Sequence, residues 1–492
     1  MPLKRVELDD IQGLVRFGYK YQTQACFLLL RIKDLNAARA WLAAAPVTSA
    51  ATIEPPPATA LQVALSSDGL RALGVAADIV EAFSAEFVSG MGGDASRARR
   101  LGDVGASAPG QWQWGTGARV PHVLVLLYAL PGQLDAWQRF IEAQCAAGFD
   151  TLARLPCSDL RDHEPFGFRD GISQPQPDWK RERPARDAEQ PGYSNLACLG
   201  EFLLGYPNEY GGYTDRPVLA AQRDAQALPR AEDAPDRADL GRNGSYLVLR
   251  QLRQDVQGFW QWVDHQAGGD PVRREELAAA MVGRTLQGAP LANAAAQDLN
   301  DFTYDEDPRG AHCPLGAHVR RANPRTGDLP PGEPGIVSWL KRTLGFDAQA
   351  LDQDLVASTR FHRLLRRGRE YGAAVPLAQA LVAPSGDADP TGLHFICLGA
   401  SIARQFEFVQ SAWLSATHFN GLQNQSDPLL GTRLAASDGT PTDGFSIPQA
   451  DGPAQRLQGL PQFVSVLGGA YFFLPGIRAL RYLASSAHGG ST

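Results

Sequence analysis

The chain has 492 residues, of which 44% are hydrophobic and 20% charged, as in an ordinary folded globular protein. One hydrophobic core rarely extends over such a length, so we expect two core-forming halves. The net charge of −7 arises from 53 acidic and 46 basic residues without a long basic run, which argues against a nucleic-acid partner.

The first third of the chain predicts the element order β-α-β-β-α-β, which is that of a ferredoxin-like unit. Asp34 caps a helix that should run to about Ala44, short Ala-rich helices follow over 67–90, and Pro131 opens a second long helix. Four apolar, strand-sized segments lie at residues 25–32, 61–65, 120–130 and 150–156.

The same pattern returns in the second part of the chain. A strand at 246–250 precedes a helix that carries Phe259 and Trp260, and a strand at 393–398 precedes a helix at 402–413. These pairs predict an α+β fold made of two ferredoxin-like halves, although an unduplicated α+β protein could also contain them. We expect the two halves to span residues 1–175 and 196–484.

The cysteines and the N-terminus predict the compartment. Six scattered cysteines without a CxxC pair are typical of reduced thiols in a cytosolic protein, not of a disulfide framework or a structural zinc site. Residues 1–7 lack the features of an export signal, and no apolar stretch reaches the roughly 18 residues of a membrane-spanning helix. We therefore expect a cytoplasmic protein that does not enter a membrane.

His318 is the first residue that could carry chemistry, as an axial ligand of haem iron. It lies in the segment 313–325, which contains two prolines and several arginines. Neutral imidazole is a common axial ligand, and arginines are suitable partners for haem propionates. The alternative is a structural histidine beside a surface arginine cluster, and His362 is a rival ligand.

Asp170 and Arg366 are the other two candidates. Asp170 lies between Gly167 and Gly171, and glycines let the backbone approach a flat ligand closely, although an ordinary Asp-Gly turn is the simpler interpretation. A strand over the segment around 366 would direct Arg366 to one face and Arg367 to the other, unless this is a solvated strand edge. The chain has no HExxH motif, GxSxG elbow or Gly-rich phosphate loop.

Taken together, several segments resemble the dye-decolourising peroxidase family, and in the same order along nearly the whole chain. The run from Gly167 to Gly171 fits the GxxDG signature of that family. The other matching segments are Asp10-Ile11-Gln12-Gly13-Leu14-Val15, residues 200–207, residues 243–248, residues 313–325, Arg366-Arg367-Gly368 and residues 404–408.

The resemblance implies a duplicated ferredoxin-like α+β barrel with antiparallel sheets, which binds haem b (iron protoporphyrin IX) between sheet and helices. It implies that His318 is the proximal iron ligand, that Asp170 is a distal acid–base residue and that Arg366 is the distal arginine. The remaining implied haem contacts are Arg325 as a propionate partner, Leu393 and Phe395 as walls of the distal pocket, and Asp427 as the acceptor for the second ring nitrogen of His318.

The implied activity is the reduction of hydrogen peroxide and the oxidation of dyes, phenols or other small organic one-electron donors, through a ferryl intermediate. Bulky donors would pass electrons to haem through surface Trp or Tyr residues. The alternatives are a haem-binding or iron-handling protein with little turnover and a haem-free scaffold, and a homo-oligomer is possible. A long insertion at about 326–357 leaves the register of the arginine open, with Arg367 or Arg363 as substitutes.

Overall fold

In the computed structural model, the residues that the structure describes are 5–182, 193–220, 225–326, 359–382, 390–449 and 451–485. Almost all of the expected insertion at 326–357 lies outside these residues. Within the described residues, no helix is long and apolar enough to cross a membrane.

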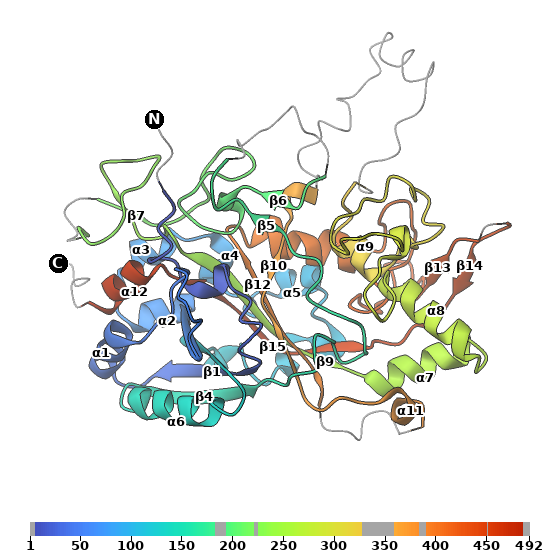
Figure 1. Ribbon diagram of the computed structural model, residues 1–492, viewed down its shortest axis with the longest axis horizontal. Helices are drawn as coiled ribbons and strands as arrows, with labels where there is room; N and C mark the ends of the chain where they lie inside the picture. Colours follow the sequence, from blue (N-terminus) through green and yellow to red (C-terminus); the bar gives the residue numbers. More distant parts are fainter. Residues whose placement is uncertain are drawn as a thin grey trace, which may run out of the picture.

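An antiparallel nine-stranded sheet runs through the molecule (Figure 1), in the order β10-β12-β9-β15-β2-β3-β1-β4, with β11 paired beside β12. Its strands are β1 (Gln24–Ile32), β2 (Thr59–Leu65), β3 (Val123–Ala129), β4 (Phe149–Pro156), β9 (Ser245–Gln254), β10 (Leu365–Arg366), β11 (Arg369–Tyr371), β12 (Gly392–Gly399) and β15 (Val464–Leu474). The fold is therefore a mixed α+β architecture with antiparallel pairing, as the alternation of strand and helix patterns predicted.

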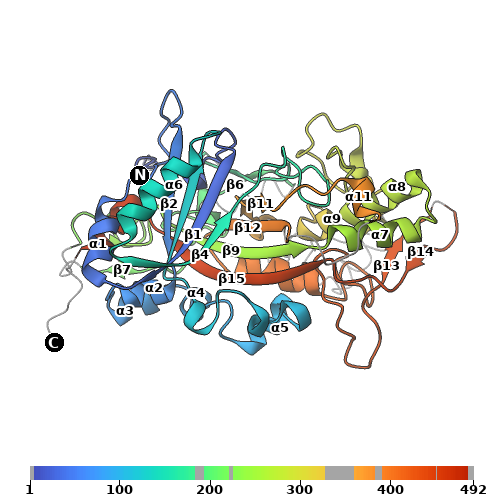
Figure 2. The ribbon, with the colours of Figure 1, turned by 90° about the horizontal axis from the view of Figure 1, so that it is seen from below.

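The sheet consists of two sets of strands with the same spatial order. In the first set the order is β2-β3-β1-β4, and in the second it is β10-β12-β9-β15, so that each set reads second, third, first, fourth along the chain. The sets meet where β15 pairs with β2, at Phe473 and Leu65. Figure 2 shows β9 and β15 extending side by side across the molecule.

Helices cover the sheet, and most begin where the sequence predicted. Asp34 caps α1 by accepting a hydrogen bond from the Ala37 amide. The expected helix start at Pro131 was wrong, because α6 begins only at Leu134, after a turn that contains the positive-φ residue Gly132. The longer helices are α1 (Leu35–Ala44), α6 (Leu134–Cys145), α7 (Val256–Gln266), α8 (Pro271–Val282) and α12 (Ile477–Ala484).

The shorter elements complete the layers around the sheet. The predicted helix at 402–413 is present as two π-helical segments, Ala403–Glu407 and Val409–Ser415. The short helices are α2 (Ser67–Ala72), α3 (Ala77–Glu81), α4 (Ala85–Ser89), α5 (Ala95–Leu101), α9 (His318–Ala322) and α11 (Leu377–Ala380), and the small strand pairs are β5 (Gln176–Pro177) with β6 (Leu196–Ala197), β7 (Val218–Leu219) with β8 (Ala238–Asp239), and β13 (Phe445–Ile447) with β14 (Gln455–Leu457).

Both faces of the central sheet are buried. Along β1, Leu28 and Leu30 belong to one hydrophobic cluster, whereas Phe27 and Leu29 belong to the cluster on the opposite face. Successive side chains of a strand point to opposite faces, so a strand buried on both sides has a continuous apolar run instead of an alternating one. This explains why the first strand was readable from the sequence.

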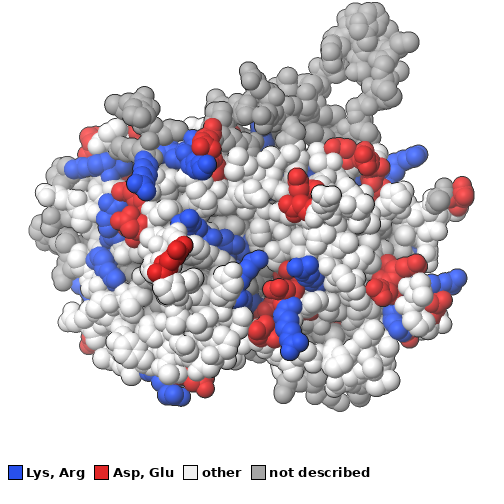
Figure 3. Space-filling model, in the orientation of Figure 1, with Lys and Arg blue, Asp and Glu red and all other residues white. Residues whose placement is uncertain are grey.

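The surface carries both signs of charge. On the face seen in Figure 3, acidic and basic side chains are interspersed, and neither sign forms a large continuous field. This agrees with the modest net charge of −7.

Candidate functional site

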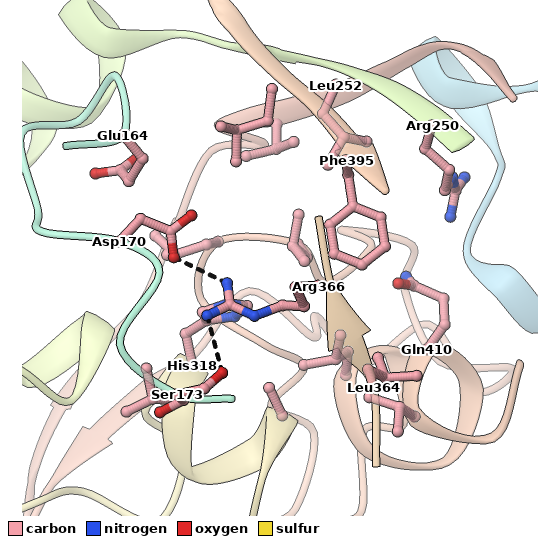
Figure 4. Close-up of a pocket in the computed structure, with 18 of the residues that line it drawn as sticks. Glu164, Asp170, Ser173, Arg250, Leu252, His318, Leu364, Arg366, Phe395 and Gln410 are labelled. Carbon is pink, nitrogen blue, oxygen red and sulfur yellow. Dashed lines mark hydrogen bonds and ion pairs between the residues drawn. The ribbon is translucent and has the colours of Figure 1, made fainter. Parts of the chain in front are cut away.

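A cavity with about 1890 Å³ of empty space, part of it open to solvent, lies against one face of the second set of strands. Strands β9, β12 and β15 form one wall, and the loop 164–175, helix α9 and the π-helical segment around Gln410 form the others. Figure 4 shows Asp170, Arg366 and His318 around this cavity, with Phe395 and Leu364 also on its walls. The three candidate residues from the sequence are therefore neighbours in space.

His318 is the first residue of α9, and a hydrogen bond to Asp427 fixes the orientation of its ring. Its Nδ1 lies 3.0 Å from Oδ2 of Asp427, whose side chain is fully buried. The other oxygen of Asp427 accepts hydrogen bonds from the amides of Leu429 (2.9 Å) and Leu430 (2.8 Å). The His318 side chain is 25% exposed and lines the cavity, and no hydrogen bond to its Nε2 occurs among the described residues.

Burial and charge act in opposite directions on this pair. Burial disfavours both charged forms, but the attraction between the two groups and their hydrogen bond prevail. They raise the pKa of His318 and lower the pKa of Asp427. Asp427 is thus an ionised acceptor for Nδ1–H. When the ring is neutral, its lone pair is therefore on Nε2, where it can bind a ligand in the cavity.

Asp170 and Arg366 form an ion pair on the cavity wall. Nη1 of Arg366 donates to Oδ1 of Asp170 at 2.9 Å, and Nη2 donates to the carbonyl of Ser173 at 3.3 Å. Burial raises the pKa of Asp170, but the positive charge of Arg366, together with the hydrogen bonds from Arg366 and from the Gly171 amide, leaves the pKa below its usual value. The carboxylate is therefore ionised at neutral pH.

The structure places Arg366, and not Arg367, at the cavity; Arg363 lines the cavity as well. In β10, Arg366 is paired with Cys397 of β12 and lines the cavity. The next residue, Arg367, points to the other face, where its guanidinium donates to the carbonyls of Leu14 and Val15. Alternation along the strand thus separates the two arginines, as the sequence predicted.

Gln174 fixes the backbone of Arg366, and sequence reasoning missed it. Its side-chain oxygen accepts from the Arg366 amide (3.1 Å), and its side-chain nitrogen donates to the Arg366 carbonyl (3.1 Å). The Gln174 carbonyl in turn accepts from the side chain of Asn300 at 2.9 Å. A strand of only two residues is thereby held by a side chain, and because the contact joins positions 192 residues apart, no local motif could reveal it.

Of the remaining residues expected at the cavity, Leu393 and Phe395 line it and Arg325 does not. Leu393 and Phe395 of β12 line the cavity, whereas His394 between them faces the opposite side and stacks on Tyr371. Arg325 does not line the cavity: it donates to the carbonyls of Asn300 and Phe302.

Other basic residues border the cavity instead of Arg325. Arg284 donates to the Ser173 hydroxyl at 2.9 Å, and burial lowers the pKa of Arg284 to about 10. Arg363 donates to the hydroxyl of Tyr193 (3.0 Å) and to the carbonyl of Ser194 (2.5 Å). The rival ligand His362 also lines the cavity, but its Nδ1 lies 2.5 Å from the carbonyl of Arg404 and its ring stacks on Phe408.

These residues fit a haem better than a bare metal ion. Among the described residues, no group of three or more His, Cys, Asp or Glu side chains is arranged to hold a metal. A metal at Nε2 of His318 would therefore take its other ligands from a non-protein group such as a porphyrin. The apolar walls suit a flat ring, and Arg284 and Arg363 suit its carboxylates.

Comparison with known proteins points in the same direction. The chain is 27% identical to dye-decolorizing peroxidase msp1 of Mycetinis scorodonius, over 98% of this chain and 88% of that protein. It is 28% identical to multifunctional dye peroxidase DyP2 of Amycolatopsis sp., over 86% of this chain and 82% of that protein. A match to deferrochelatase of Yersinia pestis, 27% identical, covers only 49% of this chain and 35% of that protein. No protein-family model matches the chain.

Solved structures give the same result for the fold. A decolorizing peroxidase from Auricularia auricula-judae superposes with a TM-score of 0.72 at 25% identity, over 98% of this chain and all of that chain. An ancestral D-type dye decolorizing peroxidase superposes with a TM-score of 0.73 at 24% identity, with the same coverage.

Proposed function

Because this chain belongs to the dye-decolourising peroxidase family, we propose that the cavity binds haem b at His318 and that the protein uses hydrogen peroxide to oxidise dyes, phenols or similar small organic donors. The observation that carries the proposal is that His318, tied to Asp427, shares one cavity with the Asp170–Arg366 ion pair. When bound, haem supplies the iron that accepts peroxide and takes up its two oxidising equivalents.

His318 and Asp427 would hold the cofactor. Nε2 of His318 is the iron ligand, and Asp427 fixes the ring orientation and increases the basicity of the ligand by accepting Nδ1–H. Arg284 and Arg363 are better placed than Arg325 to meet the propionates, because both line the cavity.

Asp170 and Arg366 would act on peroxide. An ionised carboxylate can accept a proton from the near oxygen of peroxide and return it to the far oxygen, directly or through one water molecule. The guanidinium of Arg366 only donates hydrogen bonds, so its part is to hold Asp170 in position and to stabilise negative charge on the peroxide oxygens as the bond breaks. Leu393 and Phe395 would limit the water around these groups.

We also propose that the two sets of strands are duplicated ferredoxin-like halves that together form the barrel of the fold, with bounds near 1–175 and 196–484. The shared second-third-first-fourth strand order supports this, as does the strand–helix alternation within each set. In this arrangement Asp170 comes from the end of the first half, and His318 and Arg366 come from the second.

An absorption spectrum of the purified protein, before and after one equivalent of peroxide, tests the proposal. We expect a haem Soret band that changes on peroxide addition and returns when a dye is oxidised, and we expect His318→Ala to lose the band. A stable haem spectrum without dye oxidation would favour an iron-handling protein, and the absence of haem binding after expression with ample haem would contradict the proposal.

A further inference from the structure

A second carboxylate, Glu164, borders the same cavity and lies on the loop that carries Asp170 (Figure 4). One of its oxygens accepts from the Phe168 amide at 2.9 Å. The other accepts from the Phe166 amide at 3.0 Å and from the side-chain nitrogen of Gln254, in β9, at 2.7 Å. Both the loop and the sheet therefore fix the orientation of this carboxylate.

The two carboxylates have different affinities for protons. Burial raises the pKa of Glu164 to about 7; its three hydrogen bonds oppose the rise, and the negative charge of Asp170 adds to it. Asp170 is the charged group that acts on Glu164, whereas Gln254 and the amides of Phe166 and Phe168 contact it as neutral donors. Glu164 can therefore take up and release a proton near neutrality, whereas Asp170, beside Arg366, is ionised there.

The proposed peroxidase reaction needs such a group, and this inference rests on that proposed function. Reduction of one H2O2 to two water molecules breaks the O–O bond and consumes two electrons and two protons. Two donor molecules, each oxidised by one electron, supply the electrons. A donor too bulky for the cavity leaves its protons outside, so two protons per peroxide must enter from solvent.

We propose that Glu164 is the relay residue that takes these protons from solvent and passes them through water to Asp170 and the peroxide-derived oxygen. In each transfer the O–H bond of the Glu164 carboxyl breaks and a new O–H bond forms further along the relay. Solvent then protonates Glu164 again. Glu164 acts through Asp170, so it is a positioning and relay residue and does not touch the reacting oxygens.

Infrared difference spectra provide a test that does not depend on turnover. The pKa of Glu370 is also raised to about 7, so the Glu164 signal is the part of the protonated-carboxyl stretching band that Glu164→Gln removes and Glu370→Gln retains. In the full-length protein, this part should titrate with a midpoint near 7. Gln254→Leu keeps the carboxylate but removes a hydrogen bond that lowers its pKa, so the midpoint should move upward. If the difference between the wild type and Glu164→Gln contains no carboxyl component that titrates near neutrality, or if Gln254→Leu leaves the midpoint of that component unchanged, the proposal is overturned.

The relay itself is tested by steady-state oxidation of a bulky sulfonated dye at saturating peroxide. The dye should have no group that titrates near neutrality. In the wild type, kcat should fall as the pH rises through about 7, because Glu164 loses its proton there. Glu164→Gln should be slower at low pH, by roughly tenfold or more, and lack this fall. Gln254→Leu should move the fall to higher pH, and it decides the matter if Glu164→Gln folds poorly.

Glu370→Gln is the matched control. Burial also raises the pKa of Glu370 to about 7, but Glu370 does not line the cavity, so its removal should leave the midpoint of the fall in place. If the wild type turns over and Glu164→Gln keeps its pH profile, the relay is refuted and the peroxidase function stands. If the wild type binds no haem or oxidises no dye, both proposals are refuted, because the relay serves that reaction.

Discussion

Replacement of Arg366 by Leu tests the distal pair. The substitution removes a guanidinium that is 2.9 Å from Asp170 and that holds the pKa of Asp170 below its usual value. Loss of one preorganised donor to a developing negative charge typically slows a reaction by about 100- to 1000-fold. We expect a loss of that size in the bimolecular rate constant for peroxide, measured by stopped-flow absorbance at the Soret band with haem content unchanged.

The same variant should also change the pH dependence. In the wild type, the lowered pKa keeps Asp170 ionised as the pH falls. The reaction with peroxide should therefore persist until the pH is below the usual Asp pKa of about 3.9. Without Arg366, burial is no longer offset by the charge and hydrogen bond of that residue, so the pKa of Asp170 should rise and activity should be lost at a higher pH.

Arg366→Lys is the matched control for charge. It keeps a cation but not the planar fork that contacts both Asp170 and the Ser173 carbonyl, so its rate should lie between those of the wild type and Arg366→Leu. An Arg366→Leu enzyme that reacts with peroxide at the wild-type rate and with the wild-type pH profile would refute the reasoning.

Three further substitutions test the supports of the site. Asp427→Asn should weaken haem binding by about 10- to 100-fold, because His318 loses its anionic acceptor; haem titration checks this, and unchanged affinity would contradict it. Gln174→Leu should slow the peroxide reaction about tenfold without loss of haem, because the backbone of Arg366 loses both of its contacts to the Gln174 side chain; an unchanged rate would show that β10 needs no such support. Asp103 and Arg250 form a buried ion pair that borders the cavity. Asp103→Asn should lower the free energy of unfolding by about 3 kcal/mol, since it leaves Arg250 buried without its anion; denaturant titration measures this, and a change within error would count against a structural role for the pair.

The sequence made some parts of this molecule predictable because their determinants are local. The apolar runs of β1 and β3 are strands buried on both faces, and Asp34 caps α1 through a contact three residues away. The alternation of Arg366 and Arg367 follows from strand geometry alone.

Other parts of the site could not be predicted from the sequence, because they depend on contacts between residues that are distant along the chain. Gln174 and Glu164 support the site through bonds to Arg366 and Gln254, which are far away along the chain, and no spacing rule reveals such pairs. Arg325 was expected at the cavity because of a resemblance, but it does not line the cavity, and its Nη1 donates to the carbonyls of Asn300 and Phe302. The start of α6 was misplaced because proline is common both in turns and at the first position of helices.

The separation of Asp170 from Arg366 has a consequence for biosynthesis. These two side chains are 196 positions apart, and β10 depends on the loop after Asp170 as well as on β12, which is made later. A growing chain therefore cannot assemble the pair until most of it has left the ribosome. Neither half alone, as a truncated product or a proteolytic fragment, would have a complete centre with which to generate oxidants in the cell.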